Sequence, residues 1–380
     1  MRLVLWDGTC ASAPPPAPVG DIVLHERSAL LGLAADPEYF FGEAYMSGRL
    51  SVRGALEPVV EALSRLPGPD VTWHDRVRSW FTRPNSLPDS RRNVHAHYDL
   101  GNDFYGLWLD PELIYTCAYF DRPDATLEQA QRFKLDTICR KLHLRPGDTV
   151  VEAGCGWGAL ALHMAREYGV RVTAFNISVE QLAFARERAR REGLAGRVDF
   201  VDDDYRNVTG TFDAFVSVGM LEHVGTRHFG ALAAVLRRAV KRDGGRGLLH
   251  FIGRDVPRPL NAWIRHRIFP GAYPPTVAEV TTQVLTPAGW SVLDVENLRL
   301  HYERTLAHWA ARFAANREVA RVRYGPEFTR AWELYLAGSQ AAFATGWMQL
   351  FQIVCAPRES APPWWTRPAG PQSVAADDSL

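Results

Sequence analysis

Three glycines stand close together in the segment "VEAGCGWGAL", which covers residues 151–160. They follow Glu152 at alternate positions, as Gly154, Gly156 and Gly158, in the order E-x-G-x-G-x-G. Glycine lets the backbone come close to a bound ligand, and the helix that follows such a loop offers unpaired N–H groups at its start. The segment therefore predicts a ligand-binding loop, although a tight strand-to-helix turn without a ligand would use the same glycines.

The spacing of the glycines argues against a nicotinamide dinucleotide. A dinucleotide site favours G-x-G-x-x-G and an acidic residue at the end of the second strand, where it binds the ribose. Here the pattern is G-x-G-x-G, and the second strand ends in "AFNIS" without a carboxylate. An acidic residue at the end of the first strand, followed by alternating glycines, resembles the S-adenosylmethionine loop of class I methyltransferases.

Two polar segments after the next strands could add contacts to a ligand. In "NISVEQ" (176–181), Ser178 and Gln181 have the spacing of a capping box, and Gly193 is placed to end the helix. A Gln181 side chain that reaches a ribose is the alternative. In "DDDYR" (202–206), the aspartates either form a solvated loop or lie where an adenine binds in this fold. The residues leave both pairs of alternatives open.

Alternating strands and helices must position these loops. From Leu144 onward, apolar runs typical of strands ("DTVVEAG", "VRVTAFNIS", "VDFVDDD", "FDAFVSVGM") alternate with helical patterns, and "WSVLDVENL" and "MQLFQIVCA" are expected as late strands. Helices are expected through "LAHWAARFAANREVARV" and "PEFTRAWELYLAGSQAAFA". This alternation predicts an α/β fold with a doubly wound, mostly parallel sheet, whose ligands lie beyond the carboxyl ends of the strands.

Turn-rich segments suggest how the chain is divided. "APPPAPVG" is a proline-rich spacer, and "SWFTRPNSLPDSRRN" combines prolines, small polar residues and basic residues. We predict a small N-terminal α+β domain over residues 1–78, a linker over 79–93, a catalytic domain over 94–357 and a flexible tail over 358–380.

The overall composition narrows the possible functions. The 380 residues include 43 basic and 43 acidic side chains, so net charge gives no reason to expect a nucleic-acid partner. The five cysteines are scattered without a zinc-like pair, which predicts free thiols, no metal site and a cytoplasmic protein. The longest apolar stretch, 341–356, is interrupted by Gln349 and Gln352 and is too short to span a bilayer.

Taken together, eight segments resemble the cyclopropane-fatty-acyl-phospholipid synthase family of S-adenosylmethionine-dependent methyltransferases. They are "HYDLGNDFYGLWLD" (97–110), "YTCAYF" (115–120), "EAGCGWG" (152–158), "DYR" (204–206), "SVGMLEHVG" (217–225), "LLHFIG" (248–253), "RIFPGAYP" (267–274) and "HYERTLAHW" (301–309). The resemblance includes "FGEAYMSG" (41–48) and ends near residue 357. It implies the Rossmann-like fold of a class I methyltransferase.

The resemblance further implies transfer of a methylene group from S-adenosylmethionine to a cis double bond of an unsaturated phospholipid, with a cyclopropane ring as the product. In the family, bound bicarbonate is the general base, and its cage corresponds here to Cys117, Glu222, His250, Ile252 and Tyr302. An anion in an acyl pocket needs several hydrogen-bond donors, which the thiol, imidazole, phenol and isoleucine N–H would supply. The glutamate would orient the imidazole or accept from the O–H of bicarbonate.

Family similarity also assigns contacts to the cofactor. In order from the methionine carboxylate through the ribose to the adenine, they are Tyr115, Thr116, Gly154, Cys155, Gly156, Asn176, Gln181, Asp204 and Tyr205. Four positions depart from the usual pattern: Thr116 replaces a serine, Glu152 an aspartate, His301, before the cage tyrosine, an aspartate, and Ser339, in the last helix, a cysteine.

Other functions remain open for this sequence. The same cage could yield a methyl-branched or methylene product, Glu222 and His250 could serve as the base of an amine N-methyltransferase, or the chain could bind the cofactor without catalysis. "FGEAYMSG" favours a lipid substrate.

Basic and aromatic residues of the linker, including Arg91 and Arg92, and of "WIRHRIFPGAY" (263–273) predict peripheral association with the inner face of the membrane. The family suggests a homodimer.

Overall fold

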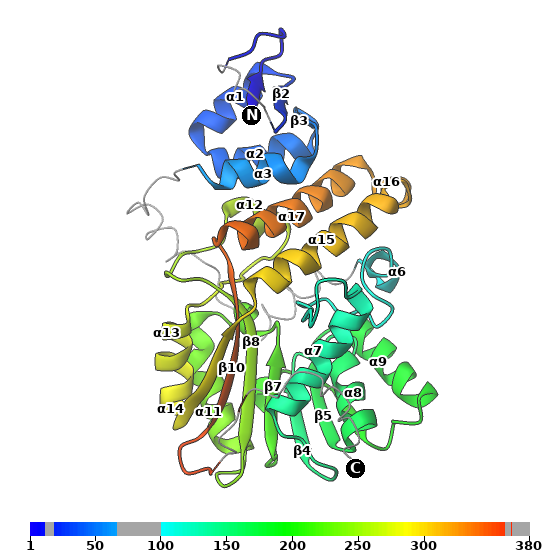
Figure 1. Cartoon of the computed structure of the whole chain (residues 1–380), viewed down its shortest axis with the longest axis vertical. Helices are drawn as coiled ribbons and strands as arrows, with labels where there is room; N and C mark the ends of the chain where they lie inside the picture. Colours follow the sequence, from blue (N-terminus) through cyan, green and yellow to red (C-terminus); the bar gives the residue numbers. More distant parts are fainter. Residues whose placement is uncertain (12–18, 67–99, 362–365, 367–380) are drawn as a thin grey trace, which may run out of the picture.

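The computed structural model describes residues 1–11, 19–66, 100–361 and 366 of the chain (Figure 1). The predicted linker, 79–93, with Arg91 and Arg92, lies outside these residues, as does most of the predicted tail. Those predictions and the domain boundaries that depend on them stay predictions. No helix within the described residues is both long enough and apolar enough to cross a membrane.

The N-terminal unit is a small α+β structure. Its three strands, β1 (Arg2–Val4), β2 (Asp21–Leu24) and β3 (Leu50–Arg53), form one sheet in which β2 lies between the other two, parallel to β1 and antiparallel to β3. Helices α1 (Arg27–Ala35), α2 (Pro37–Met46) and α3 (Leu56–Ser64) pack on it around Leu24, Leu50 and Val59. Asp36 begins α2 by accepting a hydrogen bond from Tyr39 N, and Pro37 at the first helical position needs no such partner.

The main sheet has seven strands, as expected for the α/β fold. Its order is β6 (Val198–Asp202), β5 (Arg171–Asn176), β4 (Thr149–Ala153), β7 (Ala214–Val218), β8 (Arg246–Gly253), β10 (Gln349–Pro357) and β9 (Trp290–Asn297). The first five are parallel, and β10 runs antiparallel to both β8 and β9. The predicted late strands are confirmed as β9 and β10.

Helices cover both faces of this sheet because its central strands are apolar on both sides. In β4, Val150 packs with one cluster and Val151 with the cluster on the opposite face. Figure 1 shows α7 (Leu127–Lys141), α8 (Ala159–Tyr168) and α9 (Val179–Arg191) on one side, and α11 (Phe229–Ala239), α13 (Val277–Val280) and α14 (Thr286–Ala288) on the other. A π-helical turn, η3 (Thr281–Leu285), joins the last two helices. Short helices α6 (Asn102–Tyr105), α10 (Leu221–Val224) and α12 (Ala262–Arg267) and 3-10 turns η1 (Tyr205–Asn207) and η2 (Thr226–His228) complete the fold.

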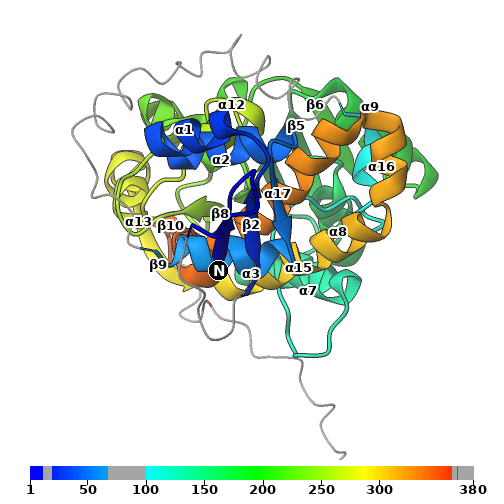
Figure 2. The ribbon, with the colours of Figure 1, turned by 90° about the horizontal axis from the view of Figure 1, so that it is seen from above.

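A layer of three helices separates the carboxyl end of the sheet from the N-terminal unit. They are α15 (Arg299–Ala315), α16 (Arg317–Tyr324) and α17 (Pro326–Thr345), and the two views agree that the N-terminal unit sits over them (Figures 1 and 2). The helix expected over residues 306–322 is broken at Asn316. The Asn316 side chain donates to Arg312 O and to Leu107 O, at 3.1 and 2.9 Å, so the turn is anchored to the neighbouring segment.

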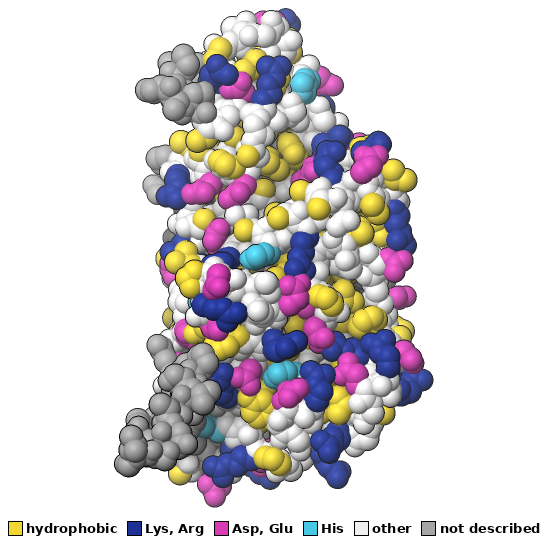
Figure 3. All heavy atoms as spheres, turned by 45° about the vertical axis from the view of Figure 1, so that its right-hand side comes forward, with side chains coloured by type: hydrophobic (Ala, Val, Ile, Leu, Met, Phe, Trp, Pro, Cys, Tyr) yellow, Lys and Arg dark blue, Asp and Glu magenta, His cyan; other side chains and the backbone are white. Residues whose placement is uncertain are grey.

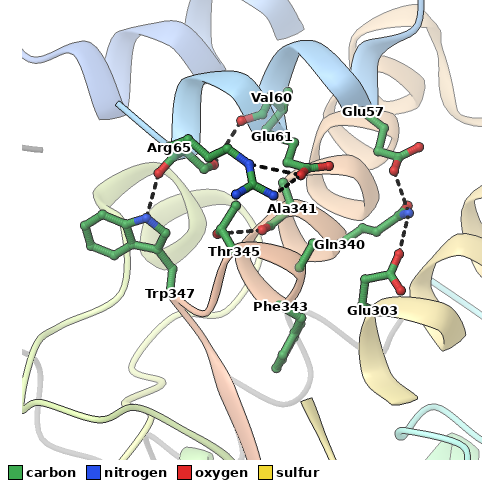
Figure 4. Close-up of polar contacts among 12 residues, drawn as sticks. Glu57, Val60, Glu61, Arg65, Glu303, Gln340, Ala341, Phe343, Thr345 and Trp347 are labelled. Atoms are coloured by element: carbon green, nitrogen blue, oxygen red, sulfur yellow. Dashed lines mark hydrogen bonds and ion pairs between the residues drawn. The ribbon is translucent and has the colours of Figure 1, made fainter. Parts of the chain in front are cut away.

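Polar contacts join the N-terminal unit to this helical layer. Figure 4 shows Gln340 of α17 between two carboxylates: its Nε2 donates to Glu57 of α3 at 2.8 Å and to Glu303 of α15 at 3.1 Å. Trp347 Nε1 donates to Ser64 O at 2.7 Å. The Gln340 side chain thus connects α3 of the N-terminal unit with α15 and α17 of the helical layer.

Part of the segment expected to meet a membrane, 263–273, contacts the N-terminal unit, and its association with a membrane stays a prediction. Trp263 is buried, and a Cβ on Gly42 of α2 would lie 2.4 Å from its ring. Arg267 forms a two-fold ion pair with Glu43 of the same helix, at 2.7 and 2.8 Å. Gly42 and Glu43 of the "FGEAYMSG" motif therefore form the surface of α2 on which α12 packs. A side chain larger than that of glycine at position 42 would collide with the Trp263 indole.

Candidate active site

A cavity of about 190 Å³ lies beyond the carboxyl ends of β4, β5, β6 and β7. All nine residues that the resemblance assigned to the cofactor line it, although they come from segments between residues 115 and 205. They are Tyr115, Thr116, Gly154, Cys155, Gly156, Asn176, Gln181, Asp204 and Tyr205. The parallel sheet brings these loops to one edge, which is where the alternation of elements placed a ligand.

Glycine is needed at different positions of the loop for different structural reasons. All three adopt positive φ angles, 82°, 53° and 82° for Gly154, Gly156 and Gly158. A Cβ on Gly158 would lie 2.7 Å from the ring of Phe200, so this glycine permits close packing. A Cβ on Gly156 would meet no atom within 4 Å, and Gly156 lines the cavity. The loop therefore combines a packing role at its end with an open backbone in its middle.

Asn176 organises the second loop. Its Nδ2 donates to Gly156 O at 3.1 Å and to Gln181 Oε1 at 2.8 Å, while its Oδ1 accepts from Ser178 N at 3.3 Å. Ser178 Oγ accepts from Gln181 N at 3.4 Å, so the predicted N-cap of α9 is confirmed, and Gly193 follows the end of that helix with a φ of 71°. The Gln181 side chain is not part of a capping box, because it pairs with Asn176 at the cavity wall.

The third loop is not a uniformly solvated run of aspartates. Asp202 is exposed, whereas Asp204 is buried and forms a bidentate ion pair with Arg206 at 2.7 and 2.8 Å. Tyr205 is buried beside it, and burial raises its pKa. No group within the described part of the chain forms a hydrogen bond with its hydroxyl. Since Tyr205 lines the cavity, an aromatic ring and an unsatisfied hydroxyl are available there to a ligand.

Lys134 is a cavity residue that the sequence analysis missed. Its Nζ donates to Thr116 Oγ1 at 2.7 Å, and it lines the cavity together with Glu152. Burial lowers the pKa of Lys134 to about 8 and raises that of Glu152 to about 8. Glu152 Oε2 has no hydrogen-bond partner in the described ranges of the chain. A signal was present in the sequence, because Lys134 occupies the apolar stripe of a helix with Leu127 and Ile138.

None of the five described cage residues lines this cavity; they gather beside it, around the carboxyl end of β8. His250 and Ile252 lie two residues apart on β8, and therefore on the same side of the strand, and Glu222 Oε1 accepts from Ile252 N at 3.4 Å. The group borders the cavity, because Gly219, which lines the cavity, donates its N–H to His250 O at 2.8 Å.

The other two cage residues meet at one carbonyl. Cys117 Sγ lies 4.0 Å from Leu298 O, and Tyr302 N donates to the same oxygen at 3.1 Å. Leu298 N in turn donates to Leu350 O at 2.8 Å, and Leu350 pairs with Ile252 in the sheet. Backbone bonds through Leu298 and Leu350 thus link the two parts of the expected cage, and Cys117, Tyr302 and Ile252 belong to or pack against one apolar cluster.

The departure at His301 helps to hold the cysteine segment. Phe120 N donates to His301 Nδ1 at 3.0 Å, and Ala118 N donates to Thr305 Oγ1 at 3.0 Å. Both acceptors belong to α15, the helix that carries Tyr302. The backbone on either side of Tyr119 is therefore bonded to α15, which fixes Cys117 relative to Tyr302.

A chain of buried polar groups sets the proton position on His250. Lys141 Nζ donates to Glu296 Oε2 and to Gln352 Oε1, each at 2.5 Å. An ammonium can only donate, so the amide oxygen of Gln352 faces Lys141 and its Nε2 faces His250 Nδ1, at 3.2 Å. Nδ1 must then accept, which places the ring proton on Nε2.

The ring itself is a neutral donor without a partner. Burial, followed by the nearby Lys134 and Lys141, lowers the pKa of His250 well below its usual value. Among the described residues, neither its buried Nε2 nor the buried Glu222 Oε2 has a hydrogen-bond partner. Burial also raises the pKa of Glu222 to about 7. Glu222 was expected either to orient His250 or to accept a hydrogen bond from bicarbonate. Gln352, rather than Glu222, contacts the His250 ring nitrogen Nδ1.

Comparison with known proteins gives a consistent picture. The model of the mycolic acid cyclopropane synthetase family matches residues 85–353. The chain is 37% identical over 372 residues to a probable fatty acid methyltransferase of Pseudomonas putida, covering 93% of this chain and 91% of that protein. It is 40% identical over 259 residues to the cyclopropane-fatty-acyl-phospholipid synthase of Escherichia coli strain K12, covering 68% and 66%.

Solved structures agree with these matches. The cyclopropane synthase MmaA2 of Mycobacterium tuberculosis has a TM-score of 0.66 and 31% identity, over 70% of this chain and 98% of that one. The mycolic acid cyclopropane synthase CmaA1, solved with SAH and CTAB, has the same TM-score and identity, over 70% and 97%.

Proposed function

Because the chain belongs to the mycolic acid cyclopropane synthetase family of S-adenosylmethionine-dependent methyltransferases, we propose that it transfers a methylene group to a cis double bond of an unsaturated phospholipid acyl chain, forming a cyclopropane ring. The observation that carries this proposal is the pair of unsatisfied buried atoms, Glu222 Oε2 and His250 Nε2, beside an apolar cluster. Buried polar atoms are rarely left without a partner, so these two indicate a ligand.

The residues around the cavity fit S-adenosylmethionine. Lys134 would meet the methionine carboxylate together with the Thr116 hydroxyl that it already contacts. The open backbone of Gly156 would lie against the methionine portion, and Gln181 would reach the ribose from its position beside Asn176. Tyr205 would pack on the adenine through its buried ring. These assignments use the orientation in which the sulfonium end points toward β8.

The cage residues fit bicarbonate, which is an acceptor with one O–H group. His250 Nε2–H would donate, and Glu222 Oε2 would accept from the O–H. Burial raises the pKa of the Cys117 thiol, so this group stays protonated; its hydrogen now points to Ala118 O at 3.1 Å and would have to turn toward bicarbonate in order to donate to it. The Ile252 N–H expected as a further donor is bonded to Glu222 Oε1 and would have to be shared. A cage of donors lowers the cost of burying an anion.

The reaction needs an electrophile and a base. When bound, S-adenosylmethionine supplies the electrophilic methyl group and bicarbonate the base that removes a proton from it after transfer. His250 Nε2–H and Glu222 Oε2 would hold this base beside the alkene, and the proton released on ring closure would pass to it. The chain holds both reactants close together and excludes water through the apolar cluster around Tyr302 and Leu350.

A methyl-branched or methylene product is the second candidate, because two of the similar proteins are named methyltransferases rather than cyclopropane synthases. The Pseudomonas relative is named a probable fatty acid methyltransferase. The tuberculostearic acid methyltransferase UfaA1 of Mycobacterium tuberculosis is 34% identical over 375 residues. Both products would use the same cavity and the same alkene attack, and they differ in what happens after methyl transfer.

Product analysis tests the proposal. The purified chain is incubated with S-adenosylmethionine, a monounsaturated phospholipid and bicarbonate, and the lipids are examined by mass spectrometry and NMR. A ring or a methylene adds one CH2 per acyl chain, a methyl branch adds two further hydrogens, and only the ring gives cyclopropyl proton signals. We expect the ring, with a lower yield when bicarbonate is removed. Unchanged lipid, or a product without cyclopropyl signals, would contradict the proposal.

A further inference from the structure

Arg254 is a buried arginine whose guanidinium has no partner. It follows β8 directly, is 9% exposed, and its backbone N donates to Pro275 O at 3.1 Å. Within the described part of the chain, its side chain makes neither a hydrogen bond nor an ion pair, and its Nε is buried and unsatisfied. A buried arginine is normally paired with a carboxylate, so this one requires an explanation.

The groups around Arg254 do not neutralise its positive charge. Burial and, to a smaller extent, repulsion from Arg258 together lower its pKa to about 10. Glu38 of α2 acts in the opposite direction, but its side chain is 50% exposed and lies 3.6 Å from Arg258. The Arg258 guanidinium also covers the ring of Trp347 at 4.9 Å. Two cations therefore share one exposed carboxylate.

The position of Arg254 relates it to the cage. His250 and Ile252 are the cage residues of β8, and Arg254 is the next residue of the same alternation, about 7 Å further along the chain. Beyond it lie Glu38 of α2 and Trp347 after α17, where the N-terminal unit meets the catalytic sheet. A ligand whose apolar part lies in the cage can place its other end beside this guanidinium.

One face of the described part of the chain shows how the charged side chains are distributed. On the face shown in Figure 3, basic and acidic side chains of the described residues are interspersed, without an extended basic area. An anionic ligand would therefore be recognised by particular residues. A guanidinium binds phosphate and carboxylate oxygens in a planar, two-point geometry, and it does so most strongly where water is excluded.

We propose that Arg254, supported by Arg258, binds the phosphate of the phospholipid substrate while the acyl chain lies in the cage. This inference rests on the proposed function for the identity of the lipid. The same oxyanion chemistry could come from the carboxylate of a free fatty acid or from inorganic phosphate. An unpaired buried charge lowers the stability of the protein without ligand, but it leaves the guanidinium available to an anionic ligand.

The first test measures binding without catalysis. The full chain is titrated with a short-chain, saturated phosphatidylglycerol below its micelle concentration, and with the matching diacylglycerol, which lacks the phosphate. We expect at least tenfold weaker binding of the phospholipid by Arg254→Gln, a smaller loss for Arg254→Lys, and no change for the diacylglycerol. Arg242→Gln is the matched control, because Arg242 is exposed and pairs with Glu359 far from this site.

Further arms distinguish the source of the oxyanion. If a phospholipid is the ligand, short-chain phosphatidylglycerol should bind to the unaltered protein more tightly than octanoate or inorganic phosphate. Tighter binding of octanoate would overturn the assignment of phosphate, and equal binding of phospholipid by the unaltered protein and Arg254→Gln would overturn the site itself. Because the probes carry no double bond, failure to form a cyclopropane product would refute the proposed function without altering these results.

The second test uses the sign of a stability change. Arg254→Met removes an unpaired buried charge, so without ligand it should raise the melting temperature, and binding of SAH should stay unchanged. A purely structural arginine would give the opposite sign. Loss of phospholipid binding together with a lower melting temperature and weaker SAH binding would assign Arg254 a structural role and refute the proposal.

Discussion

Replacing Gln352 with glutamate should reverse the proton position on His250. Gln352 is fully buried in β10 and now donates from Nε2 to His250 Nδ1 while its Oε1 accepts from Lys141. In Gln352→Glu both carboxylate oxygens are acceptors. Lys141 can keep its contact, but Nδ1 must then carry the proton in order to donate, which leaves Nε2 as an acceptor. The cage would lose the donor that we assign to bicarbonate.

The size of the effect follows from the bond that is lost. A hydrogen bond from a neutral donor to an anion contributes about 1.5–3 kcal/mol. If this bond is made in the transition state, its loss lowers kcat/KM by about 10- to 150-fold. Gln352→Met provides the graded comparison, since it removes both amide contacts without imposing the opposite tautomer, and its loss should be smaller than that of Gln352→Glu.

Two measurements check this reasoning. The first is kcat/KM for lipid modification at saturating bicarbonate, together with the affinity for SAH, which should not change because Gln352 does not line the cavity. The second is nitrogen NMR of labelled histidine, which reports the tautomer of His250 directly. A protonated Nδ1 in the unaltered protein, or a Gln352→Glu variant that keeps its activity and its SAH affinity, would refute the assignment.

Three further predictions concern the cofactor site, the cage and the helical layer. Lys134→Met should weaken SAH binding by about tenfold or more in calorimetry, since a buried charged hydrogen bond is lost; unchanged affinity would contradict the role of Lys134. Because burial raises the pKa of Glu222 to about 7, its neutral form favours the folded state, so this stabilising contribution is present near pH 4 and is lost as the pH rises through 7. Denaturant unfolding at pH 5 and pH 8 measures this loss. Between these pH values the free energy of unfolding of the unaltered protein should fall by roughly 3 kcal/mol more than that of Glu222→Gln. An identical pH dependence in both proteins would count against a buried, titrating Glu222. Gln340→Ala should lower the free energy of unfolding by about 1–2 kcal/mol in urea, because Glu57 and Glu303 lose their shared donor, whereas a more stable variant would contradict the bridging role.

Much of the catalytic fold was predictable because its signals are local. The strands from Thr149 onward are short apolar runs, the helices between them have one apolar stripe, and the cap at Ser178 lies three residues from its partner. Parallel strands place their following loops at one edge, so the residues after β4, β5 and β6 were expected to meet, and the cavity there contains them. The resemblance added the identity of the ligand, which the residues alone had left open.

The fine structure of the site was not predictable, because it depends on polar atoms that are distant in the chain. Gln352 contacts Lys141 across 211 positions and His250 across 102. In the sequence, Gln352 was visible only as an interruption of an apolar stretch. Likewise, Arg254 looked like one of many basic residues, and only its burial without a carboxylate distinguishes it.

The sequence by itself determined which segments form strands, helices and glycine-rich turns, since these depend on side-chain periodicity over a few residues. Only the tertiary structure decided which nitrogen of His250 carries a proton and which charges remain unpaired. The reason is register: β10 pairs with β8 so that Gln352 lies opposite His250, and a slip of one residue would turn the amide to the other face of the sheet.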